Sequence, residues 1–168
     1  MIHLLKMGGR AGIVLPDGSL TGEGIKQRVR ERLLTECNLH TIIRLPNSVF
    51  QPYATVATNL LFFQKGTPTR DVWYYEHRLP EGQKSYSKMK TIRREEFQPI
   101  ETWWNHRTES EICWKVNIHT IQERGYDLDI KNPHRKEENH EYTSQEIIGL
   151  LEKSFAKSNE LLSKIQSA

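Results

Sequence analysis

The chain has 168 residues, 36% hydrophobic and 27% charged, which is enough for one domain but lean for a self-contained core. Its net charge of +3 is uneven: residues 1–66 carry +4 and residues 67–168 carry −1, so the first part is the better candidate for contact with phosphate. Two cysteines exclude a disulfide framework, the scattered histidines do not form a metal motif, and no apolar run is long enough for a membrane span.

The first segments predict a strand preceded by the end of a helix. Residues Ile2 to Met7 are typical of the last turns of a helix, which Gly8 and Gly9 would end. The continuous apolar run from Ala11 to Leu15 predicts a strand buried on both faces, as in a parallel sheet, and Pro16 ends it.

A helix is expected from Gly24 to Glu36, with Ser19 or Thr21 as its cap. The spacing of Ile25, Val29 and Leu33 predicts one apolar face on this helix. The remaining sides are basic, so we expect them to face solvent.

Three further strands are expected at Thr41–Leu45, Val56–Phe63 and Val72–Glu76, with a loop at Asn47–Tyr53. The order of strand, helix, strand, loop and strand predicts an α/β sheet that ends in a hairpin.

Beyond residue 80 the pattern weakens. Thr91 to Trp104 is expected to be helical with a break near Pro99, and Val116 to Arg124 is expected to form a short helix or turn. We divide the chain into a sheet part (1–78), an irregular or helical extension (79–133), a charged linker (134–142) and a C-terminal helix (143–168).

The last helix carries a narrow apolar stripe. Thr143 to Glu146 has the sequence of a capping box. Behind it the stripe has a heptad spacing, formed by Ile148, Leu151, Phe155, Leu162 and Ile165, with Ser158 among them. The helix either packs on its own domain or binds a partner helix, and the spacing does not separate the two.

Four segments resemble the modification subunits of type I restriction systems, which are DNA adenine methyltransferases. Gly9–Pro16 resembles their fifth strand, His40–Phe50 their sixth strand and following loop, and Ala54–Gly66 their seventh strand. Gly125–Pro133 is similar to a segment near their C-terminus. The resemblance implies an α/β fold, the second half of a Rossmann-like methyltransferase sheet that uses S-adenosylmethionine, followed by a helical C-terminal extension.

The resemblance also implies a role for Phe50. This family transfers a methyl group to adenine N6, and the target base must leave the duplex. The loop before the seventh strand supplies an aromatic side chain for stacking, and Val49-Phe50-Gln51-Pro52 occupies that position here. Phe50 is therefore expected to stack on the adenine, with a core anchor of the loop as the alternative.

No catalytic, cofactor-binding or metal residue is expected in this chain. A glycine-rich cofactor turn is absent, and so is the family's catalytic Asn-Pro-Pro-aromatic motif. Asn132-Pro133 lacks the second proline and the aromatic residue. We expect the chain to begin in the helix before the fifth strand and to be inactive alone, with S-adenosylmethionine bound by the parent enzyme and not by this fragment.

The resemblance implies double-stranded DNA, a specificity subunit and a restriction subunit as partners, no membrane, and a cytoplasmic location. Two alternatives belong to other classes. One is a non-catalytic interaction module that docks on a specificity subunit through the last helix. The other is a small nucleic-acid binder that uses the basic helix Gly24–Glu36.

Overall fold

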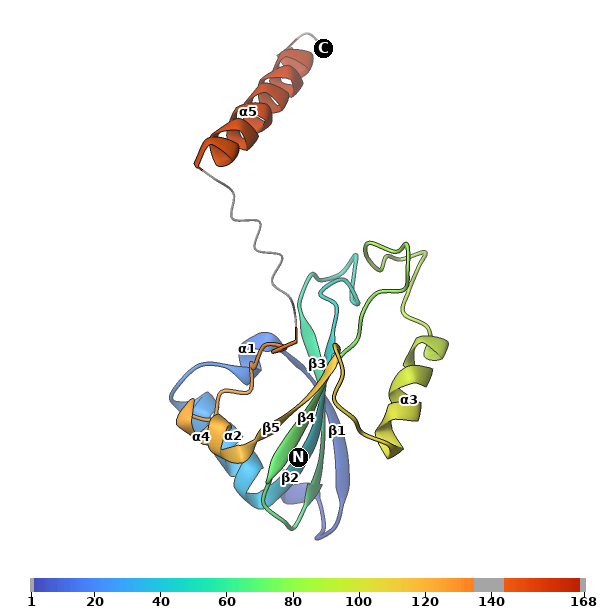
Figure 1. Ribbon diagram of the computed structural model, residues 1–168, viewed down its shortest axis with the longest axis vertical. Helices are drawn as coiled ribbons and strands as arrows, with labels where there is room; N and C mark the ends of the chain where they lie inside the picture. The colour runs from blue at the N-terminus through green and yellow to red at the C-terminus, as the bar shows by residue number, and fades with distance from the viewer. Residues whose placement is uncertain (1, 135–143, 167–168) are drawn as a thin grey trace. The chain divides into compact units, whose positions relative to one another are not determined.

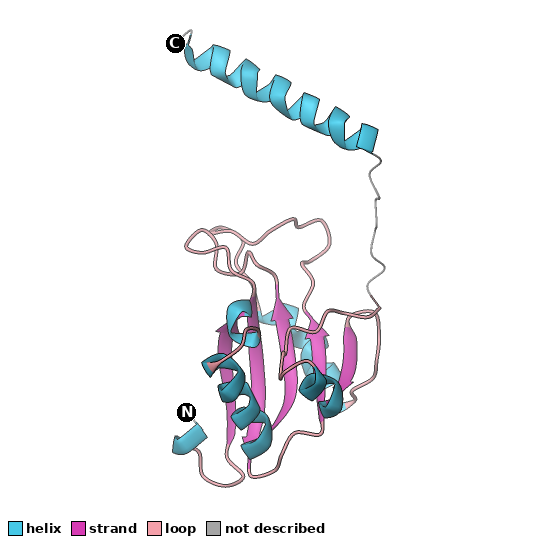
Figure 2. Ribbon diagram, turned by 90° about the vertical axis from the view of Figure 1, so that its left-hand side faces the viewer, coloured by secondary structure: helices cyan, strands magenta, loops and turns pink. Residues whose placement is uncertain are grey.

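The computed structural model describes residues 2–134 and 144–166. The chain forms two compact units, Met1–Arg135 and Lys136–Ala168. The first unit contains a five-stranded sheet with helices on both faces, as Figures 1 and 2 show. The second contains one helix, α5. Among the described helices, none combines the length and the apolar composition that crossing a membrane requires.

The sheet has the order β1-β3-β2-β4-β5, and only the β2–β4 pair is parallel. This mixed α/β sheet confirms the predicted fold class. Its strands are β1 (Arg10–Pro16), β2 (Cys37–Leu45), β3 (Thr58–Lys65), β4 (Asp71–Glu76) and β5 (Cys113–Asn117). The helices of this unit are α1 (Asp17–Leu20), α2 (Ile25–Glu36), α3 (Gln98–Asn105) and α4 (Ile118–Glu123), with 3-10 turns at Ile2–Leu4 and Arg94–Phe97.

The two faces of the sheet have separate cores. On one face, under α2 and α4, Leu34, Leu61, Trp114 and Ile121 belong to one buried cluster. On the other face, α3 places Ile100 and Trp103 in a cluster with Ile43 and Tyr75. Pro99 lies in the first turn of α3, where its missing N–H costs nothing, so it begins this helix instead of breaking it.

Strand β1 differs from its prediction. Among the described strands it pairs with β3 alone, and the pairing is antiparallel. Its burial alternates along the strand, and Val14 is 54% exposed. The prediction of a strand buried on both faces of a parallel sheet was therefore wrong. The apolar Val14 on the exposed side made a strand with one exposed face resemble one that is buried on both faces.

Helix α2 is present as predicted, but it packs through another face. Ile25 and Val29 are 79% and 58% exposed, whereas Arg30 and Leu34 are buried. The predicted apolar face was therefore wrong at Ile25 and Val29. Spacing alone does not reveal that an arginine lies on the buried side, because a buried guanidinium needs partners that come from other segments.

The start of α2 also differs. The residue before the first turn is Gly24, whose φ of +71° favours glycine, and no side chain caps the helix. Ser19 lies in the short helix α1, and Thr21 follows it with an extended backbone. The prediction that Ser19 or Thr21 caps α2 was wrong.

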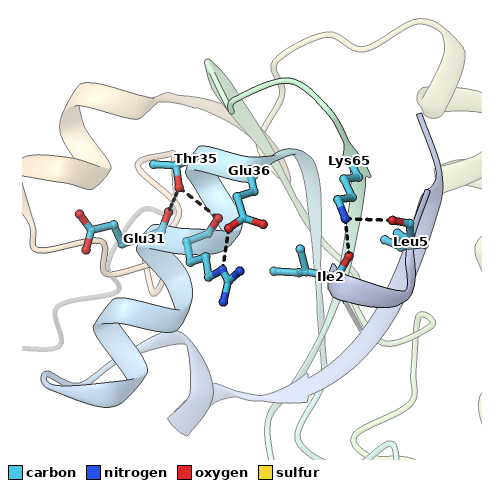
Figure 3. Close-up of polar contacts among 7 residues, drawn as sticks. Ile2, Leu5, Glu31, Thr35, Glu36 and Lys65 are labelled. Carbon is cyan, nitrogen blue, oxygen red and sulfur yellow. Dashed lines mark hydrogen bonds and ion pairs between the residues drawn. The ribbon is translucent and has the colours of Figure 1, made fainter. Parts of the chain in front are cut away.

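The N-terminal turn is held at the end of β3, at the edge of the sheet opposite residues 46–57 and 78–94. Lys65 donates hydrogen bonds from Nζ to the carbonyls of Ile2 and Leu5, each at 2.9 Å (Figure 3). A cation at these carbonyls satisfies acceptors that a short turn leaves free. The expected end of a helix at Ile2–Met7 is a 3-10 turn of three residues.

The second unit contains α5 (Ser144–Gln166), which confirms the predicted C-terminal helix. Ile148, Leu151 and Phe155 are 55%, 51% and 67% exposed. The side chains of Leu162 and Ile165, and the cap residue Thr143, lie outside the described part of the structure.

Candidate functional site

The candidate site lies at the edge of the sheet where β1, β2 and β4 end. Residues 46–57, the β2–β3 loop, connect β2 to β3 at this edge. Residues 78–94, which we call the basic loop, follow β4 at the same edge. Both loops extend beyond the strands on the same side in Figure 1.

The β2–β3 loop is a series of turns that presents two aromatic side chains. Phe50 is 45% exposed and Tyr53 is 86% exposed. The amide of Gln51 donates to the Ser48 carbonyl at 3.0 Å, and the Tyr53 amide donates to the Phe50 carbonyl at 2.9 Å. Phe50 belongs to neither core cluster. Its ring therefore has a free surface on a loop whose backbone is internally hydrogen-bonded.

Two hydrogen bonds tie the β2–β3 loop to its neighbours. Ser48, which is 2% exposed, accepts a hydrogen bond at 3.0 Å from the backbone N–H of Tyr86 in the basic loop. At the other end of the loop, the Asp17 amide donates to the Ala57 carbonyl at 3.0 Å. These contacts fix both ends of the segment that carries Phe50.

A polar pair joins the start of β3 to α1 next to this loop. The Asn59 side chain is fully buried and donates from Nδ2 to Oδ1 of Asp17 at 2.6 Å. Within the described residues the Asn59 Oδ1 atom has no hydrogen-bond partner. An amide oxygen buried without a partner costs free energy, so this position is an acceptor that remains unused at the edge of the site.

The basic loop is anchored by a cluster of titratable groups. The Tyr86 hydroxyl donates to the Glu96 carboxylate and lies 3.1 Å from Nε2 of His77. The His77 ring stacks on Phe97 with their centroids 5.4 Å apart. Tyr86 is 1% exposed, and His77 is 7% exposed. This cluster holds the middle and the end of the loop against the sheet.

Burial shifts the protonation of this cluster. It lowers the pKa of His77 below its ordinary value, although Glu96 acts in the opposite direction. Burial and the Glu96 carboxylate both raise the pKa of Tyr86. Burial alone would raise the pKa of Glu96, but hydrogen bonds from Tyr86 and from the Arg93 backbone hold it below its ordinary value. At neutral pH the cluster therefore consists of a neutral histidine, a neutral tyrosine and a carboxylate.

The Gly125–Pro133 segment packs along the same edge. The Leu128 carbonyl accepts a hydrogen bond from the Tyr74 hydroxyl at 3.0 Å, and Arg44 forms an ion pair with Asp129. Asn132 donates from Nδ2 to the Glu76 carboxylate at 3.0 Å and to the Glu111 carbonyl at 2.7 Å. These contacts give Asn132 a structural role that joins three segments.

A second polar cluster lies at a β-bulge of β2, where the register shifts between Leu39 and Thr41. Arg107 donates to the carbonyl of His40 at 3.1 Å and lies over the ring of Trp104, 4.9 Å from its centroid. Burial and the nearby Arg107 charge lower the pKa of His40 to about 4. His40 is therefore neutral at physiological pH, and the cluster secures the bulge left by the extra residue.

The sequence predicted Phe50 as a site residue, and its role stays a prediction, but the sequence did not indicate the polar contacts near its loop. Ser48, Tyr86 and Asn59 are ordinary polar residues whose partners lie 38 to 42 residues away along the chain. No local pattern signals such pairs. Within residues 2–134 and 144–166, no group of three or more His, Cys, Asp and Glu side chains could hold a metal ion.

Comparison with known proteins identifies relatives over most of the chain. The profile of the N-6 DNA methylase family matches residues 1–142. The methylase subunit of the type I restriction enzyme EcoEI from Escherichia coli is 51% identical over 144 residues, which are 82% of this chain and 29% of that subunit. The chain thus spans less than a third of the length of this relative.

Solved structures agree with the sequence comparison. A structure described as showing complex assembly and conformational transition of the type I R-M system aligns with a TM-score of 0.74 and 33% identity, over 96% of this chain and 36% of that one. The M protein of the type I restriction enzyme EcoKI from Escherichia coli aligns with a TM-score of 0.66 and 28% identity, over 77% of this chain and 35% of that protein.

Proposed function

Because the chain belongs to the N-6 DNA methylase family, we propose that it forms part of a site-specific DNA adenine-N6 methyltransferase, the methylase subunit of a type I restriction-modification system. In this proposal the chain contributes one wall of the pocket for the target adenine. The parent enzyme uses S-adenosylmethionine, in keeping with the family, and acts in the cytoplasm on double-stranded DNA. A specificity subunit and a restriction subunit complete the assembly.

The exposed ring of Phe50 carries this proposal. An enzyme that modifies a base inside a duplex must extrude it, and the extruded base needs a flat partner in place of its lost neighbours. Phe50 offers a half-exposed π-face on a loop held at Ser48 and at Ala57. A ring that was mainly a core anchor would be expected to lie in a core cluster, and Phe50 does not.

We also propose that the catalytic groups and the cofactor site lie outside these 168 residues. The full subunit, assembled with its specificity subunit, should transfer tritiated methyl groups from S-adenosylmethionine to adenine in duplex DNA. The 168-residue chain alone should show no binding of S-adenosylmethionine in titration calorimetry. A micromolar dissociation constant for the isolated chain would overturn this division, and absence of adenine methylation by the assembled subunit would overturn the proposed function.

A second role is favoured by the stripe on α5. Ile148, Leu151 and Phe155 lie on one side of the helix and are each more than half exposed in its unit. Exposed apolar residues at heptad spacing suit a helical partner. We propose that α5 docks on helices of the specificity subunit through a stripe made of these three residues together with Leu162 and Ile165.

Phe155→Asp in the full subunit should abolish its complex with the specificity subunit, because an aspartate in an apolar seam buries an unpaired charge. Size-exclusion chromatography of the mixed subunits measures this. Ala156→Asp is the matched control, since it introduces the same charge outside the stripe and should leave the complex intact. If Phe155→Asp elutes with its partner like the wild type, α5 does not dock in this way. A collapsed melting temperature would assign the helix to the core of the subunit itself.

A further inference from the structure

The basic loop, residues 78–94, concentrates positive charge at the candidate site. Its 17 residues contain six Lys or Arg residues and one Glu, a net charge of +5 against +3 for the whole chain. The six basic residues are Arg78, Lys84, Lys88, Lys90, Arg93 and Arg94, and all of them are exposed. The loop therefore presents more net positive charge than the chain has in total.

The loop is held in place from inside while its charges face solvent. Tyr86, near its middle, is 1% exposed and bonds to Glu96, and His77 precedes the loop in the same buried cluster. Lys84 and Lys88 lie two residues on either side of this anchor. Because Tyr86 is fixed between two exposed lysines, the backbone that carries these lysines is held at a defined place on the surface. The loop therefore differs from a charged segment that is only solvated.

The loop also lies directly beside the segment that carries Phe50. The Tyr86 N–H donates to the Ser48 hydroxyl at 3.0 Å, and Ser48 is two residues from Phe50. Figure 1 shows the two loops extending from the same edge of the sheet. The exposed basic side chains of residues 78–94 therefore lie on a loop that contacts the loop of Phe50.

From this arrangement we propose that the basic loop binds the phosphate backbone of duplex DNA next to the extruded base. The placement beside the base rests on the proposed function, whereas the affinity for phosphate rests on the charge and exposure of the loop. Lysine and arginine bind backbone phosphates without reading sequence, so the loop would position the duplex and leave the choice of site to other residues.

Helix α2, the other basic segment, is less suited to this role. Arg30 is buried, Arg32 is paired with Glu36 at 2.6 Å, and Lys26 donates to the Gly18 carbonyl at 2.8 Å. Three of the four basic side chains of α2 therefore already have partners within the protein. In the basic loop, by comparison, the described ion pairs include only Arg78, which lies 3.8 Å from Glu111.

The test is the salt dependence of DNA binding by the 168-residue chain, measured by fluorescence anisotropy with a short labelled duplex. Replacing Lys84, Lys88 and Lys90 with glutamine should weaken binding roughly tenfold or more and reduce the slope of log affinity against log salt by up to about 2.7, since each lost phosphate contact contributes about 0.9. The matched control replaces Lys26, Arg28 and Arg32 of α2 with glutamine and should change the slope less. All six side chains are exposed, so the melting temperature should stay close to that of the wild type.

Three results would overturn the inference: no salt-dependent binding by the wild-type chain, an unchanged slope in the loop variant, or a larger loss in the α2 variant. The proposed function is tested separately by adenine methylation in the full subunit. If the wild-type subunit methylates adenine but the loop variant shows an unchanged salt slope, the proposed role of the loop is rejected and the proposed function stands. Loop-dependent binding without methylation would reject the proposed function and retain the loop as a DNA contact.

Discussion

Arg30→Met is expected to lower the free energy of unfolding of the chain by about 3–5 kcal/mol, the largest stability loss that we predict. Arg30 is 4% exposed, and its guanidinium donates to four backbone carbonyls. The distances are 2.6 Å to Tyr126, 2.8 Å to Thr21, 2.5 Å to Gly22 and 3.4 Å to Ser19. Methionine fills a similar volume but leaves these carbonyls without the donor.

Urea unfolding followed by circular dichroism measures this change. Arg28→Met is the matched control, because Arg28 is exposed on the same helix and its loss should change stability by less than about 0.5 kcal/mol. Arg30→Lys should fall between the wild type and Arg30→Met, since an ammonium keeps the charge but not the planar fork of donors. Equal unfolding midpoints for Arg30→Met and Arg28→Met would contradict the role assigned to Arg30.

Phe50→Ala in the full subunit is expected to reduce adenine methylation roughly 10- to 100-fold, because stacking of a base on an aromatic ring contributes about 1–3 kcal/mol. Phe50→Trp should retain much of the activity, since a larger π-face still stacks. The rate is measured by transfer of tritiated methyl groups at saturating S-adenosylmethionine. Fluorescence of 2-aminopurine placed at the target position reports extrusion of the base independently.

Tyr53→Ala is the matched control for Phe50, because Tyr53 is an exposed aromatic residue in the same loop. It should lose less activity if Phe50 alone stacks on the adenine. The melting temperature separates stacking from packing. Phe50 is 45% exposed, so Phe50→Ala should cost much less than the about 3–5 kcal/mol that emptying a buried phenylalanine site costs. A loss of stability of that size would instead support the alternative that Phe50 is a core anchor of the loop.

The elements that follow local rules could be predicted from the sequence. Pro46 ends β2 at Leu45, because proline cannot extend the hydrogen-bonded ladder and disturbs the residue before it. The heptad spacing predicted α5, whose periodic stripe needs no information from the rest of the chain. The resemblance of the β2–β3 loop to a known motif located Phe50, and its role stays a prediction.

The net charges of residues 1–66 and 67–168 concealed the main local concentration of positive charge. Residues 67–168 have a net charge of −1, yet they contain the basic loop with +5. All of this loop except Arg78 lies in residues 79–133, which were expected to be irregular or helical. That part of the chain contributes β5 to the sheet beside β4. Only the fold places this charge beside the β2–β3 loop, through the contact of Tyr86 with Ser48.

By itself, the sequence determined which segments form strands and helices where proline, glycine or apolar spacing controls the backbone over a few residues. The tertiary structure alone decided which face of α2 is buried. Ile25 and Val29 have the spacing of a core face, but Arg30 is buried because carbonyls 8 to 96 residues away along the chain accept its hydrogen bonds. A charged group is stable in the interior only where such distant partners converge, and no local window of sequence contains them.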